Sequence, residues 1–71
     1  MPLIFAKTGS KVIISRIDSG IEFKNRMASL GIVPGTEVEI LSQTQSGPFM
    51  IKVKETKLAI GRGAALKLHI A

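Results

Sequence analysis

The fold of this chain is decided by the stretch from Arg26 to Val38, which reads RMASLGIVPGTEV. Gly31 stands where a helix would end and the backbone needs a positive φ, and Pro34 follows where a helix cannot continue. Gly35 then frees the backbone before a segment with strand alternation begins. The stretch therefore predicts the end of a short helix, a tight turn and the start of a strand.

The residues before this stretch predict the helix itself and a strand ahead of it. Lys11–Ile17 is rich in β-branched residues but alternates imperfectly, so we expect a central strand that is covered on both faces for part of its length. Ser19 suits the helix N-cap, and Glu22 can complete a capping box with it. One apolar stripe at helical spacing should pack on a sheet, and it consists of Phe23, Met27 and Leu30.

The rest of the chain alternates between short apolar segments and turns. Residues 1–5 could add an edge strand or cap the core, and a turn follows at residues 8–10. The polar residues 42–48 predict a loop, Glu55 and Thr56 a hairpin turn, and residues 61–65 a single helical turn. Further strands are predicted at Thr36–Ile40, Phe49–Lys54, Lys57–Ile60 and Leu66–Ile70.

These elements predict a fold of the mainly β class in one domain, residues 1–71. About five short strands cannot hide their edges in an open sheet of this size, so closure is expected. The predicted architecture is a small SH3-like barrel with one short α-helix between the first and second strands.

Composition narrows the possible functions. Ten Lys and Arg against five Asp and Glu give a formal charge of +5, which permits an acidic partner. Three Phe with no Trp or Tyr leave little material for stacking nucleic-acid bases. No cysteine is available for a disulfide, no apolar run reaches the length of a membrane helix, and no secretory leader begins the chain. The expected compartment is therefore the cytoplasm.

The sequence predicts neither an enzyme nor a metal or cofactor site. His69 is the only histidine, it alternates with Leu68 and Ile70 in the last strand, and we expect it to be exposed and without a partner. The carboxylates show no spacing typical of metal ligands. No Ser or Thr has a recognisable base beside it, and no glycine-rich loop with Lys is present for phosphate binding.

Four residues are candidates for contact with a protein partner. Lys24 and Arg26 lie on the polar face of the predicted helix, and Arg62 lies in a Gly-Arg-Gly turn that can present a guanidinium group. Met50, beside Lys52 and Lys54, could be an apolar anchor on a basic edge. A solvated surface explains the same side chains equally well.

The ordered combination of these motifs resembles the FeoA family of small bacterial proteins of ferrous iron transport. The resemblance is carried by Arg26 to Val38, by Gly47-Pro48, and by the segment from Lys57 to Leu68, KLAIGRGAALKL. It extends from about Gly9 to Ile70, so residues 1–7 match it weakly.

The resemblance implies a cytosolic accessory protein, which docks on the cytosolic part of FeoB, the membrane ferrous iron transporter, and regulates or assembles it. It further implies that membrane contact occurs only through that partner. Nucleic acid is not the expected partner, but small basic barrels also bind RNA, and this is the alternative function. Self-association through strand edges, giving a homo-oligomer, is also open.

Overall fold

Five strands and three short helices follow one another along the 71 residues that the computed structural model describes. Their order is η1 (Leu3–Phe5), β1 (Lys11–Ile17), α1 (Ile21–Ser29), β2 (Glu37–Ser42), β3 (Phe49–Val53), β4 (Thr56–Ile60), α2 (Arg62–Lys67) and β5 (Leu68–Ile70). The mainly β architecture with a helix between the first two strands is confirmed. A second helix, α2, lies between β4 and β5 and is longer than the single turn predicted.

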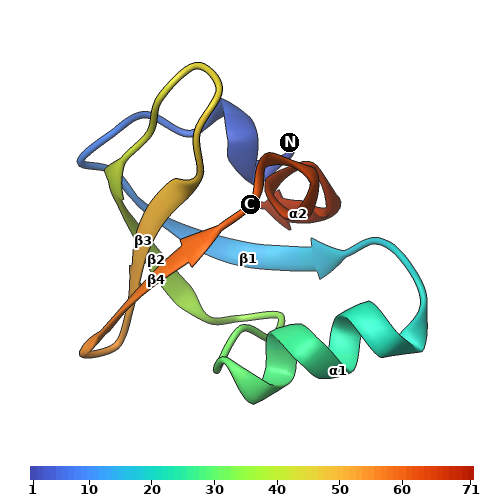
Figure 1. Cartoon of the computed structure of the whole chain (residues 1–71). Coiled ribbons are helices and arrows are strands. Elements are labelled where there is room, and N and C mark those ends of the chain that lie inside the picture. Colours follow the sequence, from blue (N-terminus) through green and yellow to red (C-terminus); the bar gives the residue numbers. More distant parts are fainter.

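The strands form one antiparallel sheet in the order β4-β3-β2-β1-β5, so β4 and β5 are its edges and α2 joins them. Figure 1 shows α1 at one end of the sheet, and η1 together with the loop between β2 and β3 at the other end. Sixteen buried residues, all of them apolar, form one core cluster. The predicted alternation of β3 is confirmed, because Phe49, Ile51 and Val53 are buried and the residues between them are not.

Strand β1 lies inside the sheet, between β2 and β5, as predicted. The prediction that both of its faces are covered is wrong, because only Ile14 and Ile17 are buried and Ile13 is exposed. The register of β1 against β5 shifts between Ile14 and Arg16. Such a bulge rotates the following side chains, and it explains the imperfect alternation of the sequence.

Helix α1 begins one residue later than a Ser19 cap would place it. Gly20 is the N-cap, no side chain caps the helix, and Ser19 has a φ of 109°, so the predicted capping box with Glu22 does not form. Phe23 and Met27 are buried as predicted, whereas Leu30 is 39% exposed. Leu30 is the C-cap and lies just past the last helical residue, so the helical spacing that would direct its side chain toward the sheet no longer applies.

The end of α1 confirms the prediction made from the two glycines. Gly31 has a φ of 87°, its N–H donates to the Ala28 carbonyl at 2.9 Å, and the Ile32 N–H donates to the Met27 carbonyl at 2.9 Å. This pair of bonds is a Schellman motif, which satisfies carbonyls that the helix would otherwise leave free. Ile32 is completely buried, so the motif also delivers an apolar side chain to the core.

The hairpin between β3 and β4 is confirmed, with its turn one residue earlier than predicted. Val53 pairs with Thr56, so Lys54 and Glu55 form the turn. Lys54 has a φ of 57°, a conformation in which a two-residue hairpin turn usually has Asn, Asp or Gly.

The prediction of the last strand, Leu66–Ile70, is partly wrong. Leu66 and Lys67 are the final residues of α2, and β5 contains only residues 68–70. The apolar N-terminal residues both cap the core and add to the edge of the sheet, the two possibilities that the sequence allowed. Leu3 is completely buried in η1, and Pro2 forms a bridge with His69 along the free side of β5.

Candidate partner-binding grooves beside helix α1

Two shallow grooves flank α1. The first, the β1–α1 groove, lies between β1, α1 and the turn after the helix. Its lining is Ser15, Arg16, Ile17, Lys24, Asn25, Ala28, Val33 and Pro34. The second, the α1–α2 groove, lies between the start of α1 and helix α2. Its lining is Ser19, Gly20, Ile21, Glu22, Phe23, Arg26, Ala64 and Lys67.

The β1–α1 groove exists because β2 pairs with only the first half of β1. The residues of β1 that pair with β2 are Lys11 to Ile13. Gly35 and Thr36, just before β2, form hydrogen bonds with Ile14, and the segment that precedes them separates from β1. Beyond that point, β1 has β5 on one side and no strand on the other. Residues 15–17 therefore present an unpaired strand edge to the groove.

The charges that line the β1–α1 groove are all basic. Arg16 and Lys24 are the charged side chains of the lining, Arg16 is paired with Asp18, and Ala28, Val33 and Pro34 provide apolar surface. Lys24 forms no ion pair, so its charge is free for a partner. The groove thus combines a strand edge, apolar surface and positive charge.

The α1–α2 groove is electrostatically more mixed. The Lys67 ammonium lies 5.0 Å from the centroid of the Phe23 ring, so part of its charge is used within the chain as a cation–π contact. Glu22 lines the same groove as Arg26, so the net charge there is lower than a basic surface alone would give. This groove is less suited than the first to an acidic partner.

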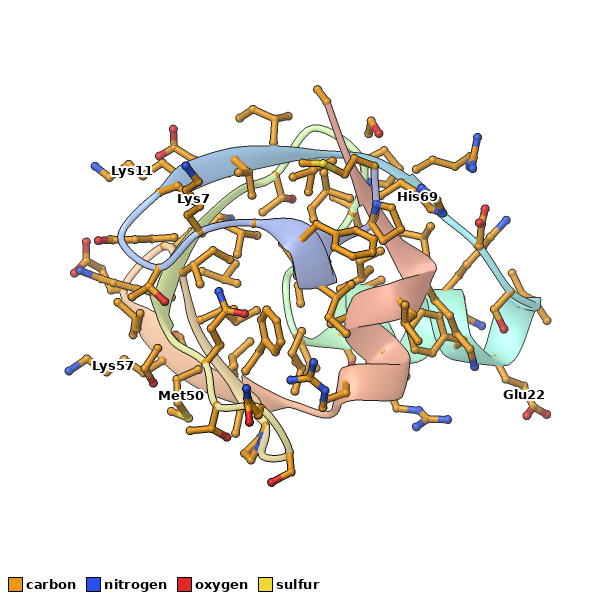
Figure 2. The ribbon with its side chains drawn as sticks, turned by 90° about the horizontal axis from the view of Figure 1, so that it is seen from above. Lys7, Lys11, Glu22, Met50, Lys57 and His69 are labelled. Carbon is orange, nitrogen blue, oxygen red and sulfur yellow. The ribbon has the colours of Figure 1, made fainter.

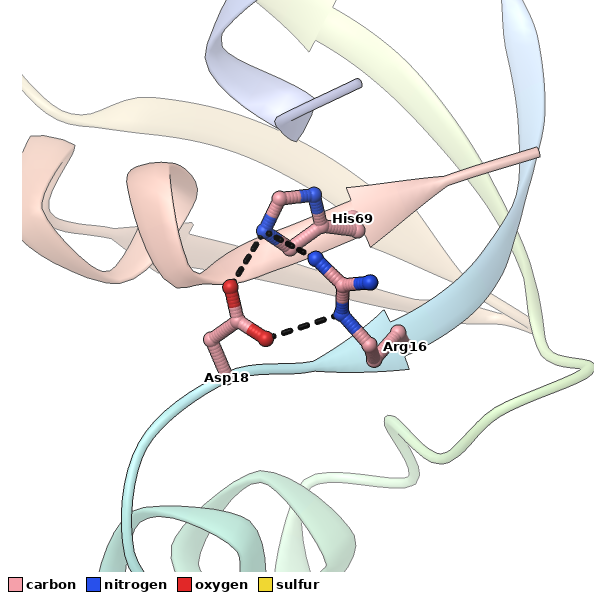
Figure 3. A network of polar contacts seen from close by, with 3 residues as sticks. All are labelled: Arg16, Asp18 and His69. Carbon is pink, nitrogen blue, oxygen red and sulfur yellow. Dashed lines mark hydrogen bonds and ion pairs between the residues drawn. The ribbon is translucent and has the colours of Figure 1, made fainter.

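A polar cluster of Arg16, Asp18 and His69 lies where β1 ends, and Figure 3 shows it from close by. Arg16 Nε donates to Asp18 Oδ1 at 2.9 Å, and His69 Nε2 lies 2.6 Å from Asp18 Oδ2. The short contact places the Nε2 proton on the side of Asp18, so the 3.5 Å approach of Arg16 Nη2 to that nitrogen is not a hydrogen bond. The cluster fastens the chain after β1 to β5.

The hydrogen bond from the Arg16 guanidinium lowers the pKa of the Asp18 carboxyl below its ordinary value, and the contact with His69 lowers it further. Desolvation opposes these effects and is a smaller influence than the Arg16 hydrogen bond, although a larger one than the hydrogen bond with His69. The positive charge of Arg16 lies beside both potential ligand atoms, which disfavours a metal cation at this place. No group of three or more His, Asp or Glu side chains converges anywhere in the chain.

The expectation that His69 is exposed and unpartnered is wrong. Its side chain is only 18% exposed, because the bulge in β1 and the bridge from Pro2 bring other segments against β5. Arg16 and Asp18 are two residues apart in sequence, but His69 is 51 residues from Asp18. Sequence reasoning therefore missed the cluster, because only the pairing of β1 with β5 creates it.

The four residues predicted to contact a partner do not form one surface. Lys24 lines the β1–α1 groove, and Arg26 lines the α1–α2 groove on the other side of the helix. Met50 is half-buried on β3 opposite Ala59 of β4, and Figure 2 shows it on the side of the molecule away from Glu22 of α1.

Arg62 is engaged within the chain. Its Nη1 donates to the Thr44 carbonyl at 2.7 Å, and its guanidinium carbon lies 5.6 Å from the centroid of the buried Phe49 ring. Arg62 therefore fastens the loop between β2 and β3. Of the four candidates, Lys24 has the surroundings best suited to a partner.

The class that the fold defines is a small SH3-like domain, and comparison with known proteins supports this. A crystal structure described as a complex of FeoA from Stenotrophomonas maltophilia with zinc, and as a prokaryotic SH3 domain protein, superposes with a TM-score of 0.85. It shares 18% identity, and the match covers 100% of this chain and 89% of that one. The predicted SH3-like architecture is thereby confirmed.

The chain belongs to the FeoA family, since the family model for the FeoA domain matches residues 1–71. A protein of Methanocaldococcus jannaschii named "Putative Fe(2+) transport protein A" is 41% identical over 69 residues, which cover 97% of this chain and 83% of that protein. A crystal structure of an iron uptake regulatory protein (FeoA) is 30% identical with a TM-score of 0.89, covering 99% of this chain and 92% of that one. The family resemblance predicted from the sequence is confirmed, and it includes the N-terminal residues.

None of the helices has both the length and the apolar character needed to cross a membrane. The longest, α1, has nine residues.

Proposed function

We propose that this protein is an accessory factor of ferrous iron transport that docks on the cytosolic part of a FeoB-type transporter through the β1–α1 groove. The role is to regulate or assemble the transporter on the cytoplasmic side, by binding and without catalysis or a bound cofactor. Membership of the FeoA family and the name of the relative in M. jannaschii support the link to Fe²⁺ transport.

The observation that carries the docking surface is the unpaired edge of β1 beside basic and apolar side chains. An extended segment can add to a free strand edge through main-chain hydrogen bonds, and its side chains supply specificity. The unpaired charge of Lys24 favours an acidic segment, and the apolar surface of Ala28 and Val33 favours at least one apolar side chain on it. The expected partner segment is therefore extended, acidic and partly apolar.

RNA binding, the alternative from the sequence, has less support. Lysines on the exposed sheet face stand beside acidic side chains, since Lys11 and Lys52 both pair with Glu39. Glu37 and Glu55 lie among them in the same shallow depression. A phosphate backbone would meet both signs of charge on this face, so we do not propose an RNA partner.

Binding to the purified transporter in detergent tests the proposal, with Lys24→Glu and Arg26→Glu as matched variants on two sides of one helix. Reversing a charge at a steered interface should weaken binding by roughly tenfold, so Lys24→Glu should have that effect and Arg26→Glu one below about twofold. Amide signals of residues 15–17 should shift on titration. Equal losses in the two variants would remove the groove from the proposal, and no binding by the wild-type chain would remove the partner.

A further inference from the structure

The end of the molecule opposite α1 has no assigned role, and it differs in charge from the rest. Residues 1–7 and residues 43–48 lie there, and helix α2 runs from them toward α1, where Lys67 contacts Phe23. We call these three segments the acid-free end. Hydrogen bonds join them, since Gln43 Nε2 donates to the Ala6 carbonyl at 2.7 Å and Arg62 donates to the Thr44 carbonyl. Figure 1 shows η1 and the loop between β2 and β3 side by side at this end.

No Asp or Glu occurs in any of the three segments. The chain's five acidic residues lie elsewhere, at Asp18, Glu22, Glu37, Glu39 and Glu55. Lys7, Arg62 and Lys67 belong to the three segments, and the loop of residues 43–48 is polar but uncharged. The charged side chains of the three segments are therefore all basic, and the nearest acidic residues, Asp18 and Glu22, lie beside Lys67 at the far end of α2.

Large apolar side chains are exposed at the same end. Phe5 is 66% exposed and Leu66 is 51% exposed, and they lie on η1 and α2, which contact one another. Met1, which precedes Phe5 by four residues, is also exposed. Phe5 is also the one aromatic side chain outside the core, since Phe23 and Phe49 are both buried.

The shape of this end suits a flat partner. The four depressions in the surface are lined by other parts of the chain, apart from Ala64 and Lys67 of α2 in the α1–α2 groove. Projecting apolar side chains with nearby cations are the features of proteins that bind at the surface of an anionic bilayer. A peptide, by contrast, binds in a groove or along a free strand edge, and this end provides neither.

We propose that the acid-free end binds the surface of an anionic lipid bilayer, with Phe5 and Leu66 entering the headgroup region. Lys7, and the N–H groups of Arg62 that are not bonded to Thr44, face lipid phosphates. This contact is direct, and it needs no protein partner. Few side chains take part, so the affinity is low, and a second attachment to the same membrane would strengthen it through effective concentration. With α1 at the opposite end of the sheet, the β1–α1 groove would face away from the lipid.

The test uses the isotopically labelled chain with vesicles of phosphatidylglycerol, and vesicles of phosphatidylcholine as the neutral control. Amide signals of residues 3–7 and 62–66 should broaden with the anionic vesicles and recover when salt is added. Because one basic residue near an anionic surface changes the affinity about fivefold, Lys7→Gln should weaken binding by about that factor. Phe5→Ser with Leu66→Ser should abolish the broadening.

The matched control is Ile21→Ser, which removes an apolar side chain that is 69% exposed on α1. It should bind the anionic vesicles as the wild type does. All substituted side chains are exposed, so the variants should keep the thermal stability of the wild type. Absence of broadening in phosphatidylglycerol, or an equal loss in Ile21→Ser and in the variant that carries both Phe5→Ser and Leu66→Ser, would overturn the proposal. The vesicles contain no transporter, so this result is independent of the docking experiment.

Discussion

The two ends of the sheet are held in place by different interactions. At the α1 end, Phe23 and Met27 are buried, and the turn after the helix brings Ile32 into the core. At the acid-free end, two hydrogen bonds from the side chains of Gln43 and Arg62 to backbone carbonyls join the three segments. The position of α1 thus depends on apolar volume, whereas the acid-free end combines the burial of Leu3, Ala6 and Ala65 with polar contacts near the surface.

Removing apolar volume from the α1 end should have the largest effect. Met27→Ala is expected to lower the free energy of unfolding by about 2–5 kcal/mol, because it removes a buried side chain and leaves a cavity. Urea denaturation followed by circular dichroism measures this. Leu30→Ala, at the exposed C-cap of the same helix, is the control and should lower the free energy of unfolding by less than about 1 kcal/mol. Equal losses would mean that burial does not hold α1.

Glycine substitutions should have opposite signs at the two ends. Gly31→Ala forces a residue with a Cβ to adopt the left-handed backbone conformation, and it should destabilise the folded chain by about 1–2 kcal/mol. The new Cβ would lie 3.6 Å from Val53 Cγ1, an ordinary contact, so the cost is conformational. Gly63→Ala in α2 meets nothing within 4 Å and should stabilise by up to about 1 kcal/mol. Thermal unfolding of both variants gives the signs, and a shared sign would refute this explanation.

Loss of a polar contact at the acid-free end should be a local event. Arg62→Ala removes the hydrogen bond to Thr44 and the contact with Phe49, and it should cost about 1 kcal/mol. Hydrogen exchange of residues 43–48 should accelerate more than exchange in the sheet. Arg26→Ala, which removes no contact of this kind, should leave both properties unchanged. Uniform acceleration through the sheet would show that Arg62 supports the whole fold.

The smallest effect is expected from the cluster between the two ends. The pKa of Asp18 is lowered in the folded chain, so its carboxylate stabilises the fold above the ordinary Asp pKa and loses this effect as the pH falls. The difference in stability between wild type and Asp18→Asn should therefore be present at neutral pH and shrink below about pH 4. In an Arg16→Gln background the difference should be smaller at every pH, because the largest cause of the shift is gone. A constant difference between pH 7 and pH 3 would contradict this.

The sequence predicted best those parts of the molecule where local pattern and burial agree. The alternation of β3 and the two glycines after α1 were interpreted correctly, since each has a local physical cause. Leu66 shows the limit, because five alternating residues fit a strand while helix α2 extends to Lys67. Over so short a segment, the two periods cannot be separated.

The candidate site was predicted less well than the fold. Lys24 and Arg26 were grouped as one helix face, but they line grooves on two sides of α1. The groove beside Lys24 arises because β2 pairs only with the first half of β1, and the sequence of α1 does not determine where that pairing ends. The Asp18–His69 contact likewise depends on strand pairing across the chain, which local pattern does not determine.

The pairing of β1 with β5 also has a consequence for the order of folding during synthesis. The hairpins between β2, β3 and β4 join neighbouring segments, so they can form as soon as those segments leave the ribosome. Strand β1 emerges early, yet the partner that pairs with Ile14 and Ile17 is the last strand to be made. We therefore expect one side of β1 to stay open on the ribosome until β5 emerges, and the nascent chain to be most prone to aggregation in that interval.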